Sequence, residues 1–406
     1  MKKLKVLTIL GTRPEAIKLA PVIQQLQAYS REVEVQVCVS GQHREMADYV
    51  LKLFNISPDF DFELMQVNQT PSQVAGRLML ALDSLLEKLL PDWILVQGDT
   101  TTVMASSIAA HHLRIKVGHV EAGLRTYDRL NPFPEEMNRF IADHLSNLHF
   151  APTSSARENL LREGINRDSI FITGNTVIDA LQWVINQPLQ PKSKKILENL
   201  GIINHTVNRN IASDYPNARP GSRSLILVTA HRRESFGKPI QNICQALRIL
   251  AERLDVQIVY LVHPNPNIWG PVHDLLDGIP GITLLPPVDY PTLVQLMKHS
   301  YLILTDSGGV QEEAPSLGVP VLVMRKKTER PEAIEAGVAK LVGTEVESIV
   351  FASQYLIDNA SAHEGMARAI NPYGDGNAAC RIAEVLIYGK CSEFNPIIVS
   401  TGGEIK

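Results

Sequence analysis

The chain has 406 residues, of which 45% are hydrophobic and 20% charged, a composition typical of a globular protein with two or three domains and sizeable cores. Its formal net charge of −4 argues against a protein that mainly binds a nucleic-acid backbone or an anionic membrane surface. No apolar stretch approaches the roughly 18 residues that a membrane span needs, so we expect neither nucleic acid nor membrane as a partner.

The cysteines and the N-terminus give no sign of a secreted protein. The apolar run near the start, VLTIL, is shorter than the core of a signal peptide and fits the first buried strand. The four cysteines lack a CxxC motif and nearby histidines at metal spacing, which fits reduced thiols and gives no zinc or redox site: Cys38, Cys244, Cys380 and Cys391. We therefore expect a cytoplasmic protein.

Short apolar runs alternate with helical patterns, which predicts βαβ units and a mainly parallel sheet in each half of the chain. The two halves, 1–186 and 224–370, are expected to be Rossmann-like α/β domains, joined at 187–223 by a linker with a surface insertion. The expected strands of the first half are Lys5–Leu10, Val33–Val39, Trp93–Val96, Lys116–His119, Leu148–Phe150 and Ile170–Thr173. Those of the second half are Leu225–Val228, Gln257–Val262, Thr283–Leu285, Tyr301–Thr305, Val321–Met324 and Lys340–Val342.

The first strand ends in GTRPEAIK, residues 11–18, where a helix is expected to begin. Thr12 and Glu15 form a capping-box pattern, and Pro14 suits the first helical position. Arg13 and Lys18 oppose the macrodipole there, and a bound polyanion would remove that penalty; the alternative is two solvated basic residues. The segment matches neither GxGxxG nor GxxxxGK[ST], so it implies neither a dinucleotide nor ATP.

Three carboxylates of the first half are candidates for chemistry. Asp99 follows a strand, where it could also serve as a helix N-cap. Glu121 ends an interior strand, where burial is costly unless the carboxylate is paired or used, and Arg125 is a candidate structural partner. Glu135 opens a helix after a proline-fixed loop, and acids in a first turn are common for dipole reasons alone.

The second half places two histidines and a glycine turn at strand ends. His231 and His263 each follow a strand, a position suited to a general acid or base or to a phosphate donor. Ser307, Gly308 and Gly309 connect a strand to a helix, so that backbone N–H groups can approach an anion; an ordinary capped turn is the alternative. Glu313, further along that helix, can reach a neighbouring sugar hydroxyl.

The chemically active side chains share one position in this scheme, the carboxyl ends of strands, where parallel sheets bind ligands. That agreement favours a catalytic cleft between the two domains that binds a phosphorylated ligand. The residues concerned are Arg13, Asp99, Glu121, His231, His263 and Ser307.

Nine segments in one order resemble the UDP-N-acetylglucosamine 2-epimerase family, most closely its bacterial non-hydrolysing members, over roughly residues 4–390. They are GTRPEAIK (11–18), GDTTT (98–102), HVEAGLRT (119–126), PEEMNR (134–139), HRRESFG (231–237), HPNP (263–266), TDSGGVQEEAPSLGVPVL (305–322), RKKTERPEA (325–333) and NPYGDGNA (371–378). The resemblance implies a glycosyltransferase-B-like fold of two Rossmann-like domains facing across a cleft, with a final helix, 371–390, crossing back to the first domain.

The resemblance also implies roles for individual residues. The diphosphate is expected on Ser307, Gly308 and Gly309, and the ribose on Glu313. Further UDP contacts are expected from Arg13, Lys18, His231 and Arg330. The matching catalytic candidates are Asp99, Glu121, Glu135 and His231. An activating second UDP-GlcNAc site is expected near Gln42, Arg44, Arg77, Arg232 and His263, although Glu45 stands where the family often has glutamine.

The implied reaction is the reversible conversion of UDP-N-acetylglucosamine (UDP-GlcNAc) to UDP-N-acetylmannosamine (UDP-ManNAc), by anti elimination of UDP to 2-acetamidoglucal and re-addition. The resemblance also implies a homodimer and no cofactor. No metal is expected, because arginine, lysine and helix termini can hold the phosphate charge. The alternatives are a hydrolysing 2-epimerase, an epimerase of a related UDP-diacetamido sugar, a glycosyltransferase, and a non-catalytic sugar-nucleotide sensor.

Overall fold

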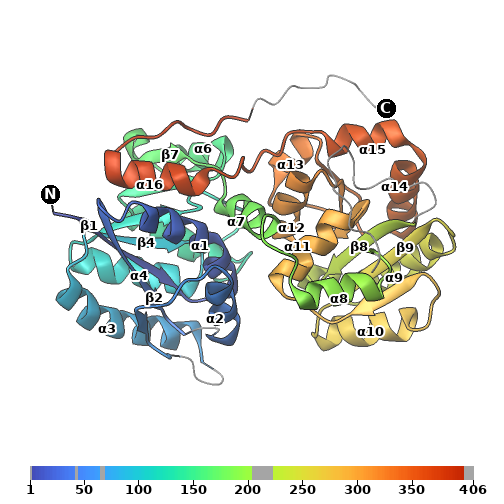
Figure 1. Ribbon diagram of the computed structural model, residues 1–406, viewed down its shortest axis with the longest axis horizontal. Helices are drawn as coiled ribbons and strands as arrows, with labels where there is room; N and C mark the ends of the chain where they lie inside the picture. Colours follow the sequence, from blue (N-terminus) through green and yellow to red (C-terminus); the bar gives the residue numbers. More distant parts are fainter. Residues whose placement is uncertain (1, 42–43, 65–68, 204–222, 397–406) are drawn as a thin grey trace. The chain divides into compact units, whose positions relative to one another are not determined.

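The computed structural model describes residues 2–41, 44–64, 69–203 and 223–396, with only the backbone at 44–46. The chain forms two compact units (Figure 1). The first comprises Met1–Trp183 together with Tyr373–Asn395, and the second comprises Val184–Pro372. Each unit is built around its own parallel sheet, as the alternation of apolar runs and helical patterns predicts.

The first unit has, among its described residues, a parallel sheet of seven strands in the order β3-β2-β1-β4-β5-β6-β7. The order reverses direction at β1 and β4, so the turns that follow these two strands meet at one edge, the usual place for a ligand. The strands are β1 (Leu4–Leu10), β2 (Val33–Val39), β3 (Phe60–Asp61), β4 (Trp93–Gln97), β5 (Lys116–Val120), β6 (Leu148–Ala151) and β7 (Ile170–Ile172).

The helices of the first unit pack apolar faces onto this sheet, and leucine and valine side chains from α3, α4, β1 and β4 form a common core. They are α1 (Arg13–Ala28), α2 (Arg44–Leu53), α3 (Pro71–Leu89), α4 (Thr101–His112), α5 (Glu135–Leu145), α6 (Ser154–Arg162), α7 (Thr176–Ile185, which ends beyond the unit) and α16 (Ala378–Tyr388).

Helix α16 joins the first unit from the far end of the chain. Its own N-cap residue makes no side-chain capping bond. Instead, the carboxylate of Asp179 in α7 accepts the N–H groups of Ala378 at 3.3 Å and Ala379 at 2.8 Å. Arg381 pairs with Asp375 at 2.7 Å and donates to the carbonyl of Thr173 at 3.0 Å, so polar contacts fix both the start and the side of α16.

The second unit has, within the described ranges, a parallel sheet of six strands in the order β10-β9-β8-β11-β12-β13. Its strands are β8 (Ser224–Ala230), β9 (Val256–Val262), β10 (Ile282–Leu285), β11 (Leu302–Thr305), β12 (Val321–Val323) and β13 (Ala339–Leu341). Its helices are α8 (Pro191–Asn199), α9 (Lys238–Ala251), α10 (Pro266–Leu276), α11 (Tyr290–His299), α12 (Gly308–Glu313), α13 (Pro331–Glu335), α14 (Val346–Asp358) and α15 (Ala360–Ala367).

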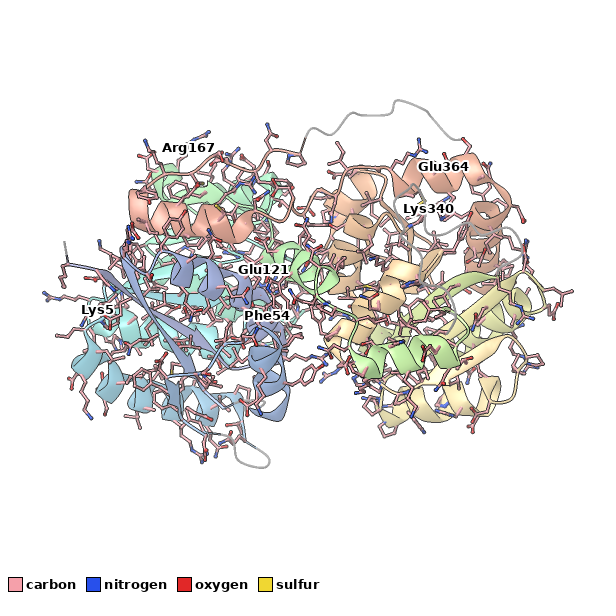
Figure 2. The ribbon with its side chains drawn as sticks, in the orientation of Figure 1. Lys5, Phe54, Glu121, Arg167, Lys340 and Glu364 are labelled. Atoms are coloured by element: carbon pink, nitrogen blue, oxygen red, sulfur yellow. The ribbon has the colours of Figure 1, made fainter. Side chains whose placement is uncertain are left out.

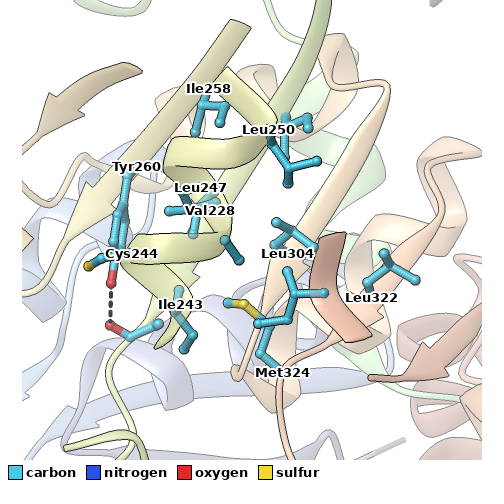
Figure 3. Close-up of a cluster of buried hydrophobic side chains, with 14 of the residues drawn as sticks. Val228, Ile243, Cys244, Leu247, Leu250, Ile258, Tyr260, Leu304, Leu322 and Met324 are labelled. Carbon is cyan, nitrogen blue, oxygen red and sulfur yellow. Dashed lines mark hydrogen bonds between the residues drawn. The ribbon is translucent and has the colours of Figure 1, made fainter. Parts of the chain in front are cut away.

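The core of the second unit lies between the central strands and α9 (Figure 3). Val228, Leu304 and Leu322 of adjacent strands meet Leu247 of α9 there, all fully buried. The phenol of the buried Tyr260 donates to the carbonyl of Ala230 at 3.4 Å, so its polar group stays satisfied inside the core.

Two sequence expectations need correction. The two-residue strand β3 was not predicted, because a pair of residues carries no periodicity. The expected linker begins with an ordered helix, α8, which packs against α11: Ser193 is buried and bonds Thr292 at 2.8 Å, and Lys192 pairs with Asp289 at 2.9 Å. The expected insertion at 204–222 lies outside the described residues.

Candidate active site

The turn after β1 is fixed by a buried carboxylate. The predicted capping box is confirmed: the Thr12 hydroxyl accepts the Glu15 N–H at 3.5 Å, and the Glu15 carboxylate accepts those of Gly11 at 3.1 Å and Thr12 at 2.6 Å. The same carboxylate accepts the Thr100 hydroxyl at 2.8 Å, which links this turn to the one after β4. Burial raises the pKa of Glu15 to about 7, although all these bonds oppose the shift.

Glu121 is held by three side chains at the end of β5. The Lys18 ammonium lies 2.5 Å from one carboxylate oxygen, which also accepts from Asn175 at 2.9 Å. The Gln97 amide donates to the other oxygen. Glu121 has a φ of 66°, in the left-handed region that a non-glycine residue rarely adopts. Figure 2 labels it among the side chains of the first unit.

Arg125 is not the partner of Glu121, so that structural alternative is wrong. Its guanidinium pairs with Asp143 at 2.6 Å and Glu163 at 2.7 Å. Asp143 also pairs with His119, whose other ring nitrogen bonds the carbonyl of Gly98 at 2.7 Å. Burial alone would raise the pKa of Asp143, but His119 and Arg125 hold it well below its usual range.

The other two carboxylates differ in their partners. The N-cap of α4 is Thr100, whose hydroxyl accepts the Val103 N–H at 3.3 Å, so the capping alternative for Asp99 is wrong. Asp99 is about one-third exposed and pairs instead with Arg139. Glu135, the first residue of α5, is half-buried, and its side chain forms no hydrogen bond or ion pair with any other described residue.

The neighbouring Glu136 is structural. It is buried, accepts the N–H groups of Thr126 at 3.0 Å and Tyr127 at 2.9 Å, and reaches Arg139 at 3.3 Å. It therefore fixes the loop that leads from β5 to α5. Arg13, at the start of α1, is exposed and pairs with no carboxylate in the described part of the chain.

In the second unit, Asp306 joins the turns that follow β8 and β11. It is fully buried, and one carboxylate oxygen accepts the N–H groups of His231 and Arg232, each at 2.8 Å, and the Ser235 hydroxyl at 2.9 Å. This role of Asp306 was not predicted from the sequence. Its signal in the sequence was an aspartate directly between a buried strand and Ser307.

The two predicted histidines lie side by side. The rings of His231 and His263 stack with centroids 5.6 Å apart, and Nδ1 of His231 lies 3.4 Å from the second oxygen of Asp306. Burial lowers the pKa of His231; Asp306 raises it, and Arg232 and His263 lower it further. The imidazole of His231 is therefore neutral at neutral pH.

Two arginines converge on the glycine turn. A Cβ at Gly308, the first residue of α12, would lie 3.7 Å from the Arg232 guanidinium and 3.8 Å from that of Arg330. Arg330 pairs with Glu312, which lies in α12 like Gly308. The positive end of a helix thus faces two cations, an arrangement that an anion would stabilise.

Glu313 lies on the same helix, buried, and accepts the Tyr290 phenol at 2.8 Å. Burial and the adjacent carboxylate raise the pKa of Tyr290 well above its usual value, so this phenol stays a donor. The second carboxylate oxygen of Glu313 lies 3.6 Å from the position that a Cβ on Gly309 would take, so Glu313 borders the glycine turn.

The residues expected at a second nucleotide-sugar site are divided between the units. Arg77 is a half-buried residue of α3 in the first unit, whereas Arg232 and His263 belong to the second. Gln42 and the side chain of Arg44 lie outside the described residues.

No group of three or more His, Cys, Asp or Glu residues in the described ranges is arranged to hold a metal ion. None of the described helices is both long and apolar enough to span a membrane.

Comparison with known proteins gives a match over nearly the whole chain. The profile of the UDP-N-acetylglucosamine 2-epimerase family matches residues 24–387. UDP-N-acetylglucosamine 2-epimerase of Escherichia coli K12 is 50% identical over 94% of this chain and 98% of its own.

Two solved structures match the fold closely. UDP-GlcNAc 2-epimerase of Neisseria meningitidis, bound to UDP-GlcNAc, has a TM-score of 0.83 and 45% identity over 94% of this chain and 99% of its own. The UDP-GlcNAc 2-epimerase of Methanocaldococcus jannaschii, in complex with UDP-GlcNAc and UDP, has a TM-score of 0.76 and 33% identity over 95% of this chain and 100% of its own. The predicted α/β, glycosyltransferase-B-like fold is confirmed, and this chain belongs to the UDP-N-acetylglucosamine 2-epimerase family.

Proposed function

We propose that this protein is a non-hydrolysing UDP-GlcNAc 2-epimerase that reversibly converts UDP-GlcNAc to UDP-ManNAc and supplies ManNAc units for a cell-surface polysaccharide. Family membership at about half identity to an enzyme of that name supports 2-epimerisation of UDP-GlcNAc. The solved relatives bound to UDP-GlcNAc and UDP support the same substrate class.

The observation that carries the proposal is the convergence of Arg232 and Arg330 on Gly308. In the proposed complex, the diphosphate of UDP lies against Ser307, Gly308 and Gly309, where the helix start and both guanidinium groups balance its charge. Glu313 accepts a hydroxyl of the ribose, and Arg13, Lys18 and His231 provide further contacts to UDP.

The chemistry requires that cleavage at C1 precede or accompany loss of the proton at C2, because a sugar C2–H bond is not acidic. The C1–O bond breaks and its electron pair leaves with UDP. A carboxylate then takes the C2 proton, and the electrons of the C2–H bond form the C1–C2 double bond of 2-acetamidoglucal. The cationic cluster around Gly308 stabilises the departing UDP. Return of a proton to the other face of C2, with re-addition of UDP, completes the inversion.

Inversion needs proton-transfer groups on both faces of the sugar, which the three carboxylates can provide. Glu121 receives hydrogen bonds from three donors, and hydrogen bonds to a carboxylate favour its ionised form, the form that a base requires. Glu135, whose side chain has no such donors among the described residues, is the second candidate. Asp99, paired with Arg139, is the third candidate.

Product analysis tests the proposal. The pure protein is incubated with UDP-GlcNAc without added metal, and the mixture is followed by NMR until it stops changing. We expect an equilibrium mixture of UDP-GlcNAc and UDP-ManNAc. Accumulation of free ManNAc and UDP would identify a hydrolysing epimerase instead, and an unchanged substrate would contradict the proposal.

The family resemblance further predicts a homodimer and activation by UDP-GlcNAc at a neighbouring second site. The residues that match or lie near that site are Gln42, Arg44, Arg77, Arg232 and His263. Sedimentation velocity tests the homodimer, with a monomer as the contrary result. Activation is tested by following the reaction that starts from UDP-ManNAc. If the second site activates, added traces of UDP-GlcNAc shorten the slow initial phase of that reaction. If it does not, they leave the progress curve unchanged.

A further inference from the structure

Asp306 is a fully buried carboxylate of the second unit to which the proposed function gives no role. It lies between β11 and the Ser307 turn, and its side chain reaches the turn that follows β8. One carboxylate oxygen is saturated by three donors: two backbone N–H groups and the Ser235 hydroxyl. These bonds leave the carboxylate little freedom to rotate. The position of its second oxygen is therefore fixed by the fold.

The second oxygen of Asp306 accepts no hydrogen bond from any described residue, although it is buried. Nδ1 of His231 lies 3.4 Å away, within reach of an ion pair but longer than a well-formed hydrogen bond. A buried carboxylate oxygen without a donor costs free energy, so a small movement of the ring toward it is favourable. Hydrogen bonds of this kind are often long in the free enzyme and tighten in the substrate complex.

We propose that Asp306 is a positioning residue that holds the His231 imidazole with its Nδ1–H toward the carboxylate and so presents Nε2 to the nucleotide sugar. The inference rests on the proposed function, because it assigns His231 to the UDP side of that site. Asp306 also carries the backbone into Ser307, so the histidine and the anion-binding turn are fixed to one another by a single side chain.

The charges around His231 explain why such a partner is needed. Arg232 on its own loop and His263 after β9 both disfavour a protonated His231, and Asp306 is the acidic group that opposes them. A bound diphosphate adds negative charge on the exposed side of the ring. His231 is then able to take up a proton at Nε2 and keep Nδ1–H bonded to Asp306, as a histidine that serves a departing phosphate requires.

The inference is tested by nitrogen NMR of protein labelled in its 12 histidines, with the His231 signals assigned by their absence in His231→Asn. With UDP bound, we expect the neutral His231 ring to carry its proton at Nδ1. We also expect the pKa of the His231 imidazole to be higher than in the free protein. In Asp306→Asn, the amide oxygen keeps the three donors and its NH₂ faces Nδ1, which must then accept, so the proton should move to Nε2. A wild-type ring protonated at Nε2, or an unchanged tautomer in Asp306→Asn, would overturn the inference.

Kinetics supply the second arm, with Ser235→Ala as the matched control because it removes one donor to Asp306 but leaves the oxygen near His231. We expect Asp306→Asn to lower kcat by about 10²–10⁴-fold, the range of general acid–base catalysis, with KM changed less than about threefold. Ser235→Ala should change both less than about threefold. Equal losses in the two variants would show a merely structural role. Inactive wild-type protein would contradict the proposed function. The NMR measurement of the His231 tautomer does not depend on turnover and would still test the role of Asp306.

Discussion

Glu121 illustrates how the fold prepares a residue for chemistry. Its backbone is in the left-handed region, and Lys18, Gln97 and Asn175, from three different segments, hold its carboxylate. The sequence could place Glu121 at a strand end but could not identify these partners, since they come together only when α1, β4, β5 and the turn after β7 are assembled. The nearby Arg125 was the wrong choice, because it belongs to a separate buried network around Asp143.

Replacement of Glu121 by glutamine tests whether this carboxylate does proton chemistry. Glu121→Gln keeps the size of the side chain and removes the base, so we expect solvent exchange at C2 to fall by at least about 10²-fold. UDP affinity, measured by calorimetry, should stay within a few fold. The control is Glu163→Gln, which breaks a pair with Arg125 and should lower thermal stability but retain exchange. A collapse of UDP affinity in Glu121→Gln would assign Glu121 to binding instead.

The raised pKa of Glu15 makes the stability of the folded protein depend on pH. Its folded pKa of about 7 lies above the ordinary 4.5, so the folded state holds a proton that the unfolded state releases. The contribution of this group to stability is present below pH 4.5 and is lost as the pH rises through 7. A shift of this size corresponds to about 3 kcal/mol.

Urea unfolding at pH 4.5 to 8 measures this effect, with Glu15→Gln as the comparison. Glutamine can accept the Gly11 and Thr12 N–H groups with its oxygen and donate to Thr100 with its NH₂. We expect the stability of the glutamine variant relative to wild type to increase over this range. A difference between the two proteins that does not vary with pH would contradict the assignment.

At the scale of elements, the glycine turn before α12 gains its meaning from the side chains around it. From sequence, Ser307-Gly308-Gly309 fits an ordinary capped turn equally well. In the structure, the Ser307 side chain makes no capping bond, and two arginines from other loops face Gly308. The absence of a side chain at Gly308 therefore keeps open the space in which a phosphate can approach the helix start.

Gly308→Ala separates ligand binding from folding. Its φ lies outside the left-handed region, and the added Cβ would meet the arginines at ordinary contact distances, so the fold should tolerate it. The methyl group would occupy the proposed phosphate position, and we expect UDP affinity to fall at least about tenfold. The control is Gly365→Ala in α15, where nothing lies within 4 Å of the new Cβ. It should raise stability by about 0.4–1 kcal/mol and leave UDP affinity unchanged. Unchanged affinity in Gly308→Ala would remove the diphosphate from this turn.

For the whole molecule, apolar periodicity was sufficient to predict two parallel α/β units and twelve of their strands, because parallel strands are buried on both faces and appear as continuous apolar runs. The periodicity could not reveal helix α8 in the expected linker, because its buried side consists only of Ser193, bonded to Thr292, and Leu197, too few apolar positions to form a helical pattern. Nor could it reveal that Asp179 of α7 caps α16, whose capped residue Ala379 follows it by 200 positions in the chain. Contacts between distant segments have no local pattern.

Deuterium incorporation tests the proposed elimination and re-addition most directly. The protein is incubated with UDP-GlcNAc in D₂O, and C2 of the sugar is followed by proton NMR and mass spectrometry. Removal and return of the C2 proton by solvent-exchanging carboxylates predicts loss of the H2 signal and a gain of one mass unit in UDP-ManNAc, and in UDP-GlcNAc as the reverse reaction proceeds. UDP-ManNAc formed with its original hydrogen at C2, or no conversion at all, would contradict the elimination mechanism proposed for this protein.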